Sequence, residues 1–253
     1  MATHKKKVKL EFSALSPNYD RWYKTPLGKY IDETERSAIL KFLKPCKGDR
    51  ILDVGTGTGI YLLEAVRSGA HVIGIDISVN MLNVLGEKIR NEKTYSQVDL
   101  LVADAENLPF RSNLFDKIIC NTVLEFILDS VQALKEFNRV ILLDGKVVIG
   151  VLTSTSLWAL RRRMNNLIVE DIWSKAHFFS LRTLKKISKR AGFIVEKNRW
   201  SVFAPPNCPI KLLPMYRWLE DKLNSLPIIK CLGAFLVVRL SKRPSESSFS
   251  GNA

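Results

Sequence analysis

The stretch ILDVGTGTGIYLLEAV, residues 51–66, decides the fold of this chain. An apolar run at 51–54 leads into glycines at positions 55, 57 and 59, and apolar residues at helical spacing follow them. This is the strand, glycine loop and helix pattern of an open α/β sheet. A dinucleotide-binding loop has the spacing G-x-G-x-x-G and would need a glycine at position 60, where the chain has Ile60. The loop therefore argues against a nicotinamide dinucleotide and leaves an oxidoreductase supported by fold analogy alone.

Around this stretch, Val-, Ile- and Leu-rich runs alternate with amphipathic segments, which predicts a parallel sheet flanked by helices. The expected strands are residues 50–55, 71–76, 98–104, 115–123, 146–153, 193–203 and 234–240. The expected helices are residues 60–67, 79–90, 130–140 and 180–191, with Gly192 just beyond the last of them. A proline-punctuated insertion at 205–227 is interpreted as a helical cap over one end of the sheet.

Acidic residues end or adjoin the first three predicted strands. Asp53 stands beside the glycine loop, where a carboxylate would repel a pyrophosphate and suits a ligand with cationic groups, such as the ammonium and sulfonium of S-adenosylmethionine. Asp76 follows Gly55 by 21 residues, at the position where a ribose diol would lie, and a carboxylate can accept both hydroxyl protons. Asp104, with the amide of Ala105, is placed to reach an adenine edge. Together the three carboxylates predict an S-adenosylmethionine site.

At these residues the chain resembles the class I S-adenosylmethionine-dependent methyltransferases. The resemblance is to the small-molecule group known as methyltransferase type 11, which includes ubiquinone and menaquinone biosynthesis enzymes. It also covers YDRWYKTPLGKY at 19–30, DAENLPF at 104–110 and CNTVLEFI at 120–127. It implies an α/β, Rossmann-like sheet of seven strands in the order 3-2-1-4-5-7-6, with the last strand antiparallel, helices on both faces and a C-terminal helical cap.

The resemblance also implies which residues bind the cofactor, which leaves as S-adenosylhomocysteine. Its methionine part would lie near Asp53, Gly55, Thr56 and Gly57, its ribose near Asp76 and Ile77, and its adenine near Asp104 and Ala105. Gly59, Met81 and Asn121 are expected beside them. The aromatic residues Tyr19, Trp22 and Tyr30 are expected to form a lid, with a hydrophobic staple as the alternative interpretation.

Catalytic side chains are harder to assign, because displacement at a sulfonium methyl group depends mainly on positioning and exclusion of water. If the acceptor must lose a proton, Glu125 and His177 are the candidate bases, and each also has a structural interpretation, as a turn residue and a packed histidine. The segment CNTVLE after the fourth predicted strand has no proline, which argues against methylation of amino groups on bases or glutamine.

Charge is distributed unevenly along the chain. The net charge of +14 divides into +2 over residues 1–153 (21 Lys and Arg against 19 Asp and Glu) and +12 over residues 154–253 (18 against 6). Residues 154–243 therefore suit an anionic membrane surface or RNA, with a solvated surface as the alternative. The four cysteines form no C-x-x-C pair, and no metal site is expected.

We expect one domain over residues 1–242, with a helical lid at 1–45, a cofactor-binding core at 46–153, and the substrate side and cap at 154–242. A disordered tail is expected at 243–253. No apolar run reaches the roughly 18 residues of a membrane span, and no signal-peptide pattern is present, so a cytoplasmic location, with peripheral membrane association as an option, is expected. The expected function is methyl transfer to a small molecule, including an amphiphilic one. The alternative is an S-adenosylmethionine-binding module on RNA or an anionic membrane.

Overall fold

The protein forms one seven-stranded sheet. The structure is a computed structural model that describes residues 2–92, 95–165 and 176–243. Its strands are β1 (Arg50–Val54), β2 (His71–Asp76), β3 (Val98–Val102), β4 (Phe115–Asn121), β5 (Ile141–Leu152), β6 (Phe193–Ser201) and β7 (Phe235–Lys242). Their spatial order is β3-β2-β1-β4-β5-β7-β6, and only β7 runs antiparallel to its neighbours. The predicted strand order and the reversed last strand are confirmed.

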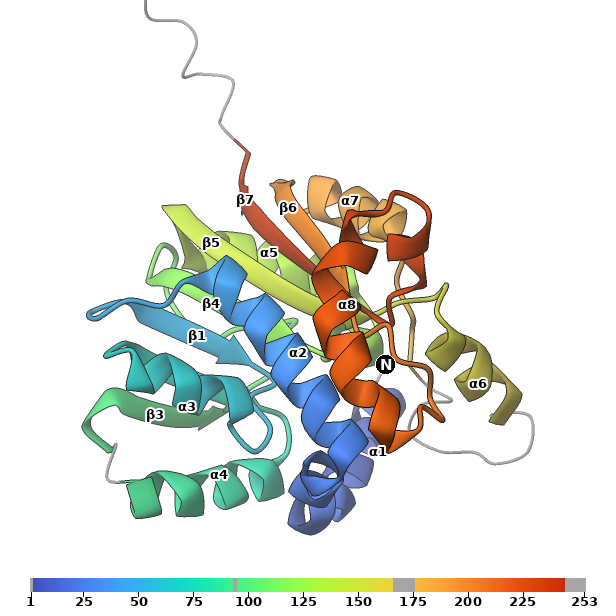
Figure 1. The fold of residues 1–253 in the computed structure, drawn as a ribbon. Helices are drawn as coiled ribbons and strands as arrows, with labels where there is room; N and C mark the ends of the chain where they lie inside the picture. The colour runs from blue at the N-terminus through green and yellow to red at the C-terminus, as the bar shows by residue number, and fades with distance from the viewer. Residues whose placement is uncertain (1, 93–94, 166–175, 244–253) are drawn as a thin grey trace, which may run out of the picture.

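Helices cover both faces of this sheet. The α-helices are α1 (Ala2–Leu15), α2 (Pro26–Leu43), α3 (Ile60–Arg67), α4 (Val79–Glu92), α5 (Ser130–Val140), α6 (Leu157–Asn165), α7 (Leu181–Arg190) and α8 (Leu213–Ser225). Short 3₁₀ turns are η1 (Ser16–Lys24), η2 (Tyr95–Gln97), η3 (Leu124–Phe126), η5 (Ile210–Leu212) and η6 (Ile229–Leu232). In Figure 1, α2 and α8 lie side by side in front of the sheet, and α5 and α7 lie behind it. Among the described residues, no helix is long and apolar enough to cross a membrane.

Two separate apolar layers follow from this arrangement, one on each face of the sheet. On one face, α2 and α3 pack against the strands through side chains such as Ile39 and Leu62. On the other face, α5 and α7 do so through side chains such as Phe137 and Leu184. The middle of the sheet is buried on both faces, which explains why its strands contain continuous apolar runs, such as 118–120 in β4 and 147–152 in β5, rather than strict alternation.

Strand β5 begins earlier than the sequence predicts. It starts at Ile141, directly after α5, and Ile141 pairs with Phe115 before an irregularity in the ladder. Asp144 and Gly145 interrupt the apolar run there, and the sequence pattern therefore does not predict this part of the strand. The predicted tail, apart from Arg243, lies outside the described residues.

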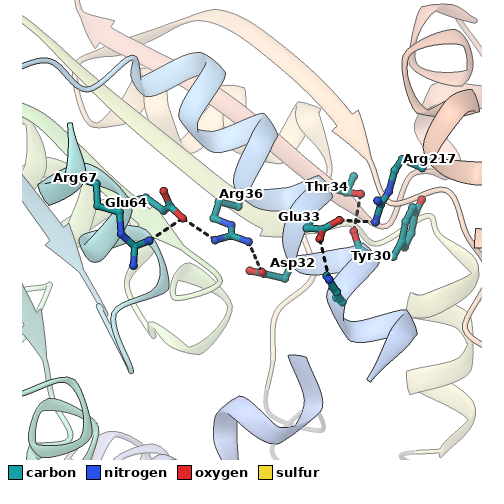
Figure 2. Close-up of polar contacts among 9 residues, drawn as sticks. Tyr30, Asp32, Glu33, Thr34, Arg36, Glu64, Arg67 and Arg217 are labelled. Atoms are coloured by element: carbon teal, nitrogen blue, oxygen red, sulfur yellow. Dashed lines mark hydrogen bonds and ion pairs between the residues drawn. The ribbon is translucent and has the colours of Figure 1, made fainter. Parts of the chain in front are cut away.

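Ion pairs hold α2 between two neighbouring helices. Arg36 binds Glu64 of α3 through Nη1 and Oε1 at 2.7 Å, and it also binds Asp32 one turn away at 2.8 Å. Glu33 pairs with Arg217 of α8. Figure 2 shows this row of charges running from α3 across α2 to α8. Such partly exposed pairs stabilise a fold only modestly, so they mainly fix the orientation of α2.

A buried hydrogen bond ties the same helix to the cap. The hydroxyl of Tyr30 donates to Oε1 of Glu220 on α8, and the carboxylate of Glu220 also accepts the amides of Val202 and Phe203 at 3.1 Å each. Burial raises the pKa of Glu220 above its ordinary value, although these donors oppose the rise. The expected place of Tyr30 in an aromatic lid is therefore wrong: its side chain is 1% exposed and links α2 to α8.

Tyr30→Phe should lower the free energy of unfolding by about 1–3 kcal/mol, because a buried carboxylate loses a hydrogen-bond donor. Urea unfolding followed by circular dichroism measures the change. Tyr216→Phe on α8 is the matched control, since the Tyr216 hydroxyl has no hydrogen bond to another described residue. Equal stability of the two variants would show that the Tyr30 hydroxyl contributes nothing.

Candidate active site

The glycine loop turns the chain from β1 into α3 at the carboxyl edge of the sheet. Gly55 has φ 66° and Gly59 has φ 87°, values in the left-handed region that favours glycine. A Cβ on Gly55 would lie 2.2 Å from Cγ2 of Val123, and one on Gly59 would lie 2.2 Å from Cδ1 of Leu85. Both positions therefore require glycine for conformation and for close packing.

Asp76, the last residue of β2, is held by two backbone amides. Its Oδ2 accepts the N–H of Gly57 at 3.0 Å, and its Oδ1 accepts the N–H of Ser78 at 2.8 Å. Burial raises the pKa of Asp76, while these two donors oppose the rise. Each carboxylate oxygen can accept a further hydrogen bond, so Asp76 is oriented by the protein and still able to bind a ligand hydroxyl.

A first cavity lies at the ends of β1, β2 and β4, and Asp76 is part of its wall. Apolar side chains, such as Ile77, Met81 and Phe126, form much of the remaining wall. The structure brings together at this cavity most of the residues that the sequence predicts for the cofactor site: Tyr19, Gly55, Gly57, Asp76, Ile77, Met81, Asp104, Ala105 and Asn121.

Besides Tyr30, three other predicted residues lie away from the wall of the first cavity: Asp53, Thr56 and Gly59. Asp53 is 2% exposed, and its Oδ2 accepts the hydroxyl of Thr56 at 2.7 Å. Burial raises the pKa of Asp53 to about 7. Gly59 packs on Leu85 at the start of α3. Asp53 and Thr56 thus support the glycine loop from behind instead of lining the cavity.

Helix α1 lies within the helical lid predicted for residues 1–45, and it contributes Lys5, Val8 and Phe12, which were not predicted, to the wall of the first cavity. Nζ of Lys5 lies 2.6 Å from Oδ2 of Asp104 and also pairs with Glu106. The ring of Phe12 packs edge-on against Phe126, with centroids 5.0 Å apart. The spacing of Val8 and Phe12, four residues apart within a lysine-rich segment, is the signal that would have indicated an apolar helix face.

A second cavity of about 610 Å³ adjoins the first. Residues of η1, α2, α6 and the loop after β6 line it, and the ends of β5 and β7 contribute Leu152 and Ala234. Tyr19 and Thr122 belong to the walls of both cavities. A ligand in one cavity would therefore lie next to a ligand in the other.

The two candidate bases lie at neither cavity. Glu125 is fully buried, and its Oε1 accepts the amide of Leu152 at 2.6 Å. Burial raises the pKa of Glu125 to about 7. His177 is exposed, and its backbone N–H donates to the carbonyl of Glu125 at 2.8 Å. Among the described residues, no group of three or more His, Cys, Asp or Glu side chains could hold a metal ion.

Known proteins share both the sequence and the fold. Residues 52–149 match the methyltransferase domain family Methyltransf_11. The chain is 31% identical over 146 residues to the ubiquinone/menaquinone biosynthesis C-methyltransferase UbiE of Geotalea uraniireducens, covering 56% of this chain and 62% of that protein. It is 38% identical over 151 residues to the demethylmenaquinone methyltransferase of Staphylococcus carnosus, covering 57% and 59%. The match thus spans about three fifths of each relative.

Solved structures agree with this result at the level of the fold. A Thermotoga maritima S-adenosylmethionine-dependent methyltransferase, described as a possible histamine N-methyltransferase, has a TM-score of 0.70 at 23% identity, covering 93% of this chain and 100% of that one. Magnesium protoporphyrin IX methyltransferase from Synechocystis, with bound S-adenosylhomocysteine, has a TM-score of 0.66 at 18% identity, covering 95% and 100%. Together the comparisons show a methyltransferase-domain match over residues 52–149 and the same fold as solved S-adenosylmethionine-dependent methyltransferases.

Lys5→Ala should increase amide hydrogen exchange in residues 2–15, because it removes the contacts of α1 with Asp104 and Glu106. Lys6→Ala is the matched control, since the Lys6 side chain is exposed on the same helix. Hydrogen exchange with mass spectrometry measures both. Wild-type protection in Lys5→Ala would show that this contact does not hold α1 over the cavity.

Proposed function

We propose that the protein is an enzyme that transfers a methyl group from S-adenosylmethionine to a small molecule. The observation that carries this proposal is the pair of cavities at the carboxyl edge of the sheet, with Tyr19 and Thr122 common to both. Two substrates that exchange a group need adjoining sites, and a purely binding module has no need of the second one. The methyltransferase names of the relatives add support.

The first cavity fits the cofactor in its chemistry. Asp76 has spare acceptor capacity for two ribose hydroxyls, and the apolar side chains of Met81 and Phe126 suit an adenine ring. A Cβ on Gly57 would meet nothing nearer than the Gly55 carbonyl oxygen at 4.0 Å, so the loop leaves open space where a ligand backbone can approach. Asp53, behind the loop, has a pKa of about 7, and its ionised form would favour a cationic ligand.

The chain's own residues contribute positioning and exclusion of water. When bound, S-adenosylmethionine supplies an electrophilic methyl group attached to a good leaving group. Asp76 would hold the ribose, and the glycine loop would hold the methionine end. Val8 and Phe12 of α1 lie over the first cavity and keep water from it. Such positioning accounts for most of the acceleration that a displacement of this kind requires.

Asp76→Ala should weaken binding of S-adenosylhomocysteine about tenfold to a hundredfold, because it removes two charge-assisted hydrogen bonds to the ribose. Asp99→Ala is the matched control, since Asp99 is exposed on the adjoining strand β3, where it pairs with Ile73. Isothermal titration calorimetry measures both affinities. Unchanged affinity of Asp76→Ala would contradict the cofactor assignment, and binding of NAD in its place would favour an oxidoreductase.

For the basic C-terminal region we propose an anionic membrane surface as the partner, in preference to RNA. The cap surface, defined as residues 210–232, exposes apolar side chains: Trp218 is 65% exposed and Ile228 is 86% exposed. Lys222 lies over the Trp218 ring at 3.5 Å, and Lys230 of η6 lies over the Trp200 ring at 5.3 Å. Exposed apolar groups among lysines suit the boundary between lipid headgroups and acyl chains.

Trp218→Ser with Ile228→Ser should reduce sedimentation of the protein with phosphatidylglycerol vesicles, because both apolar contacts with lipid are lost. Leu143→Ser is the matched control, since Leu143 is 71% exposed on β5, outside the cap surface. Equal sedimentation of wild-type protein with phosphatidylcholine vesicles, or salt-dependent binding to RNA without vesicle binding, would contradict the membrane proposal.

A further inference from the structure

The second cavity combines a positive end with an apolar wall. Its charged lining residues among the described ones are Arg161 and Arg162 of α6 and Glu35 of α2. The charges of these described lining residues sum to +2 with Glu35 neutral and to +1 with Glu35 ionised. A cavity with this excess of positive charge favours an anion.

Both arginines are held in place by neighbouring side chains. The guanidinium of Arg162 lies 5.5 Å from the ring centroid of Trp158 and 5.8 Å from that of Phe178. Nη1 of Arg161 donates to Oδ1 of Asn207 at 2.5 Å. A guanidinium has five N–H donors, and Arg161 uses Nη1 for Asn207, so its other donors can turn toward a ligand. Stacked and hydrogen-bonded arginines lose less conformational entropy when they bind an anion than free ones would.

The remaining wall suits an apolar or aromatic body. Trp22 and Tyr23 of η1 lie on one side of the cavity, and apolar residues of α2 and the strand ends complete it: Leu27, Ile31, Leu152 and Val202. The Trp22 and Tyr23 rings pack edge-on against each other at 5.1 Å. Offset and edge-on aromatic walls of this kind bind flat apolar molecules well.

We propose that the second cavity binds the methyl acceptor, and that this acceptor is an apolar or aromatic molecule with an anionic group that pairs with Arg161 and Arg162. The identification of this ligand as the acceptor rests on the proposed function. The binding chemistry does not, because it depends only on the second cavity. The reacting atom would lie toward Tyr19 and Thr122, which border the first cavity.

Glu35 makes anion binding dependent on pH. Burial, reinforced by Asp32, raises the pKa of Glu35 to about 8, while Arg162 opposes the rise. At neutral pH the carboxyl is therefore mostly uncharged, and it gains a negative charge as the pH rises through 8. Titratable and charged groups that interact with Glu35 come from every neighbouring element: Asp32, Tyr19, Tyr23, Tyr61, Glu125 and Arg162. Anion affinity should fall with rising pH.

Two fluorescent probes of similar shape test the proposal directly. Anilinonaphthalene sulfonate is aromatic and anionic, and phenylnaphthylamine is its neutral counterpart. Wild-type protein should bind the anionic probe more tightly, and Arg161→Ala with Arg162→Ala should weaken that binding about tenfold while leaving the neutral probe unaffected. Arg163→Ala is the matched control, because Arg163 is exposed on the same helix and donates to the carbonyl of Ser154.

A second arm uses pH and Glu35→Gln. Wild-type affinity for the anionic probe should fall between about pH 7 and about pH 9, and the fall should be absent in Glu35→Gln, which cannot ionise. Equal preference of the double arginine variant and wild type for the anionic probe would overturn the proposal, as would the same pH dependence in Glu35→Gln and wild type. Titration of the same samples with S-adenosylhomocysteine shows whether the proposed cofactor site binds its ligand. Failure of the anion-binding proposal can then be distinguished from failure of the proposed function.

Discussion

The tight turn between β1 and α3 is the constraint on which the site depends. Gly55 and Gly59 adopt positive φ and pack against Val123 and Leu85, so the loop can lie directly on the segment after β4 and on α4. That close approach brings the amide of Gly57 within hydrogen-bond distance of Asp76. A side chain at either glycine would push these elements apart and misplace the carboxylate that the proposed cofactor site needs.

The two cavities have largely different walls and share only Tyr19 and Thr122. The first is built from strand ends and the glycine loop, which are rigid elements, and is covered by α1. The second is lined mainly by η1, α2, α6 and the loop after β6, which are helices and loops rather than strands of the sheet. The row of ion pairs along α2 and the buried Tyr30–Glu220 bond fix the spacing between these parts (Figure 2). The proposed cofactor site and the proposed acceptor site are therefore built mostly from different residues.

The sheet could be predicted from sequence because buried parallel strands are continuous apolar runs, and Asp76 and Asp104 mark strand ends. Residues whose role depends on contacts far apart in the sequence could not be predicted in this way. Tyr30 looked like a lid residue, but its partner Glu220 lies 190 positions away. Nothing in the sequence distinguishes Glu35 from other helical charges, and the packing of α2 against η1 buries it at the wall of the second cavity. Lys5 was hidden in a basic segment that resembles a solvated end.

The central claim is that the adjoining cavities carry methyl transfer to a small molecule. Incubation of the protein with methyl-labelled S-adenosylmethionine and a cell extract, followed by separation into small-molecule, RNA and protein fractions, tests it most directly. The account predicts label in a small molecule with an anionic group, and loss of that label in Asp76→Ala. Label in RNA or protein, or no label in any fraction, would contradict it.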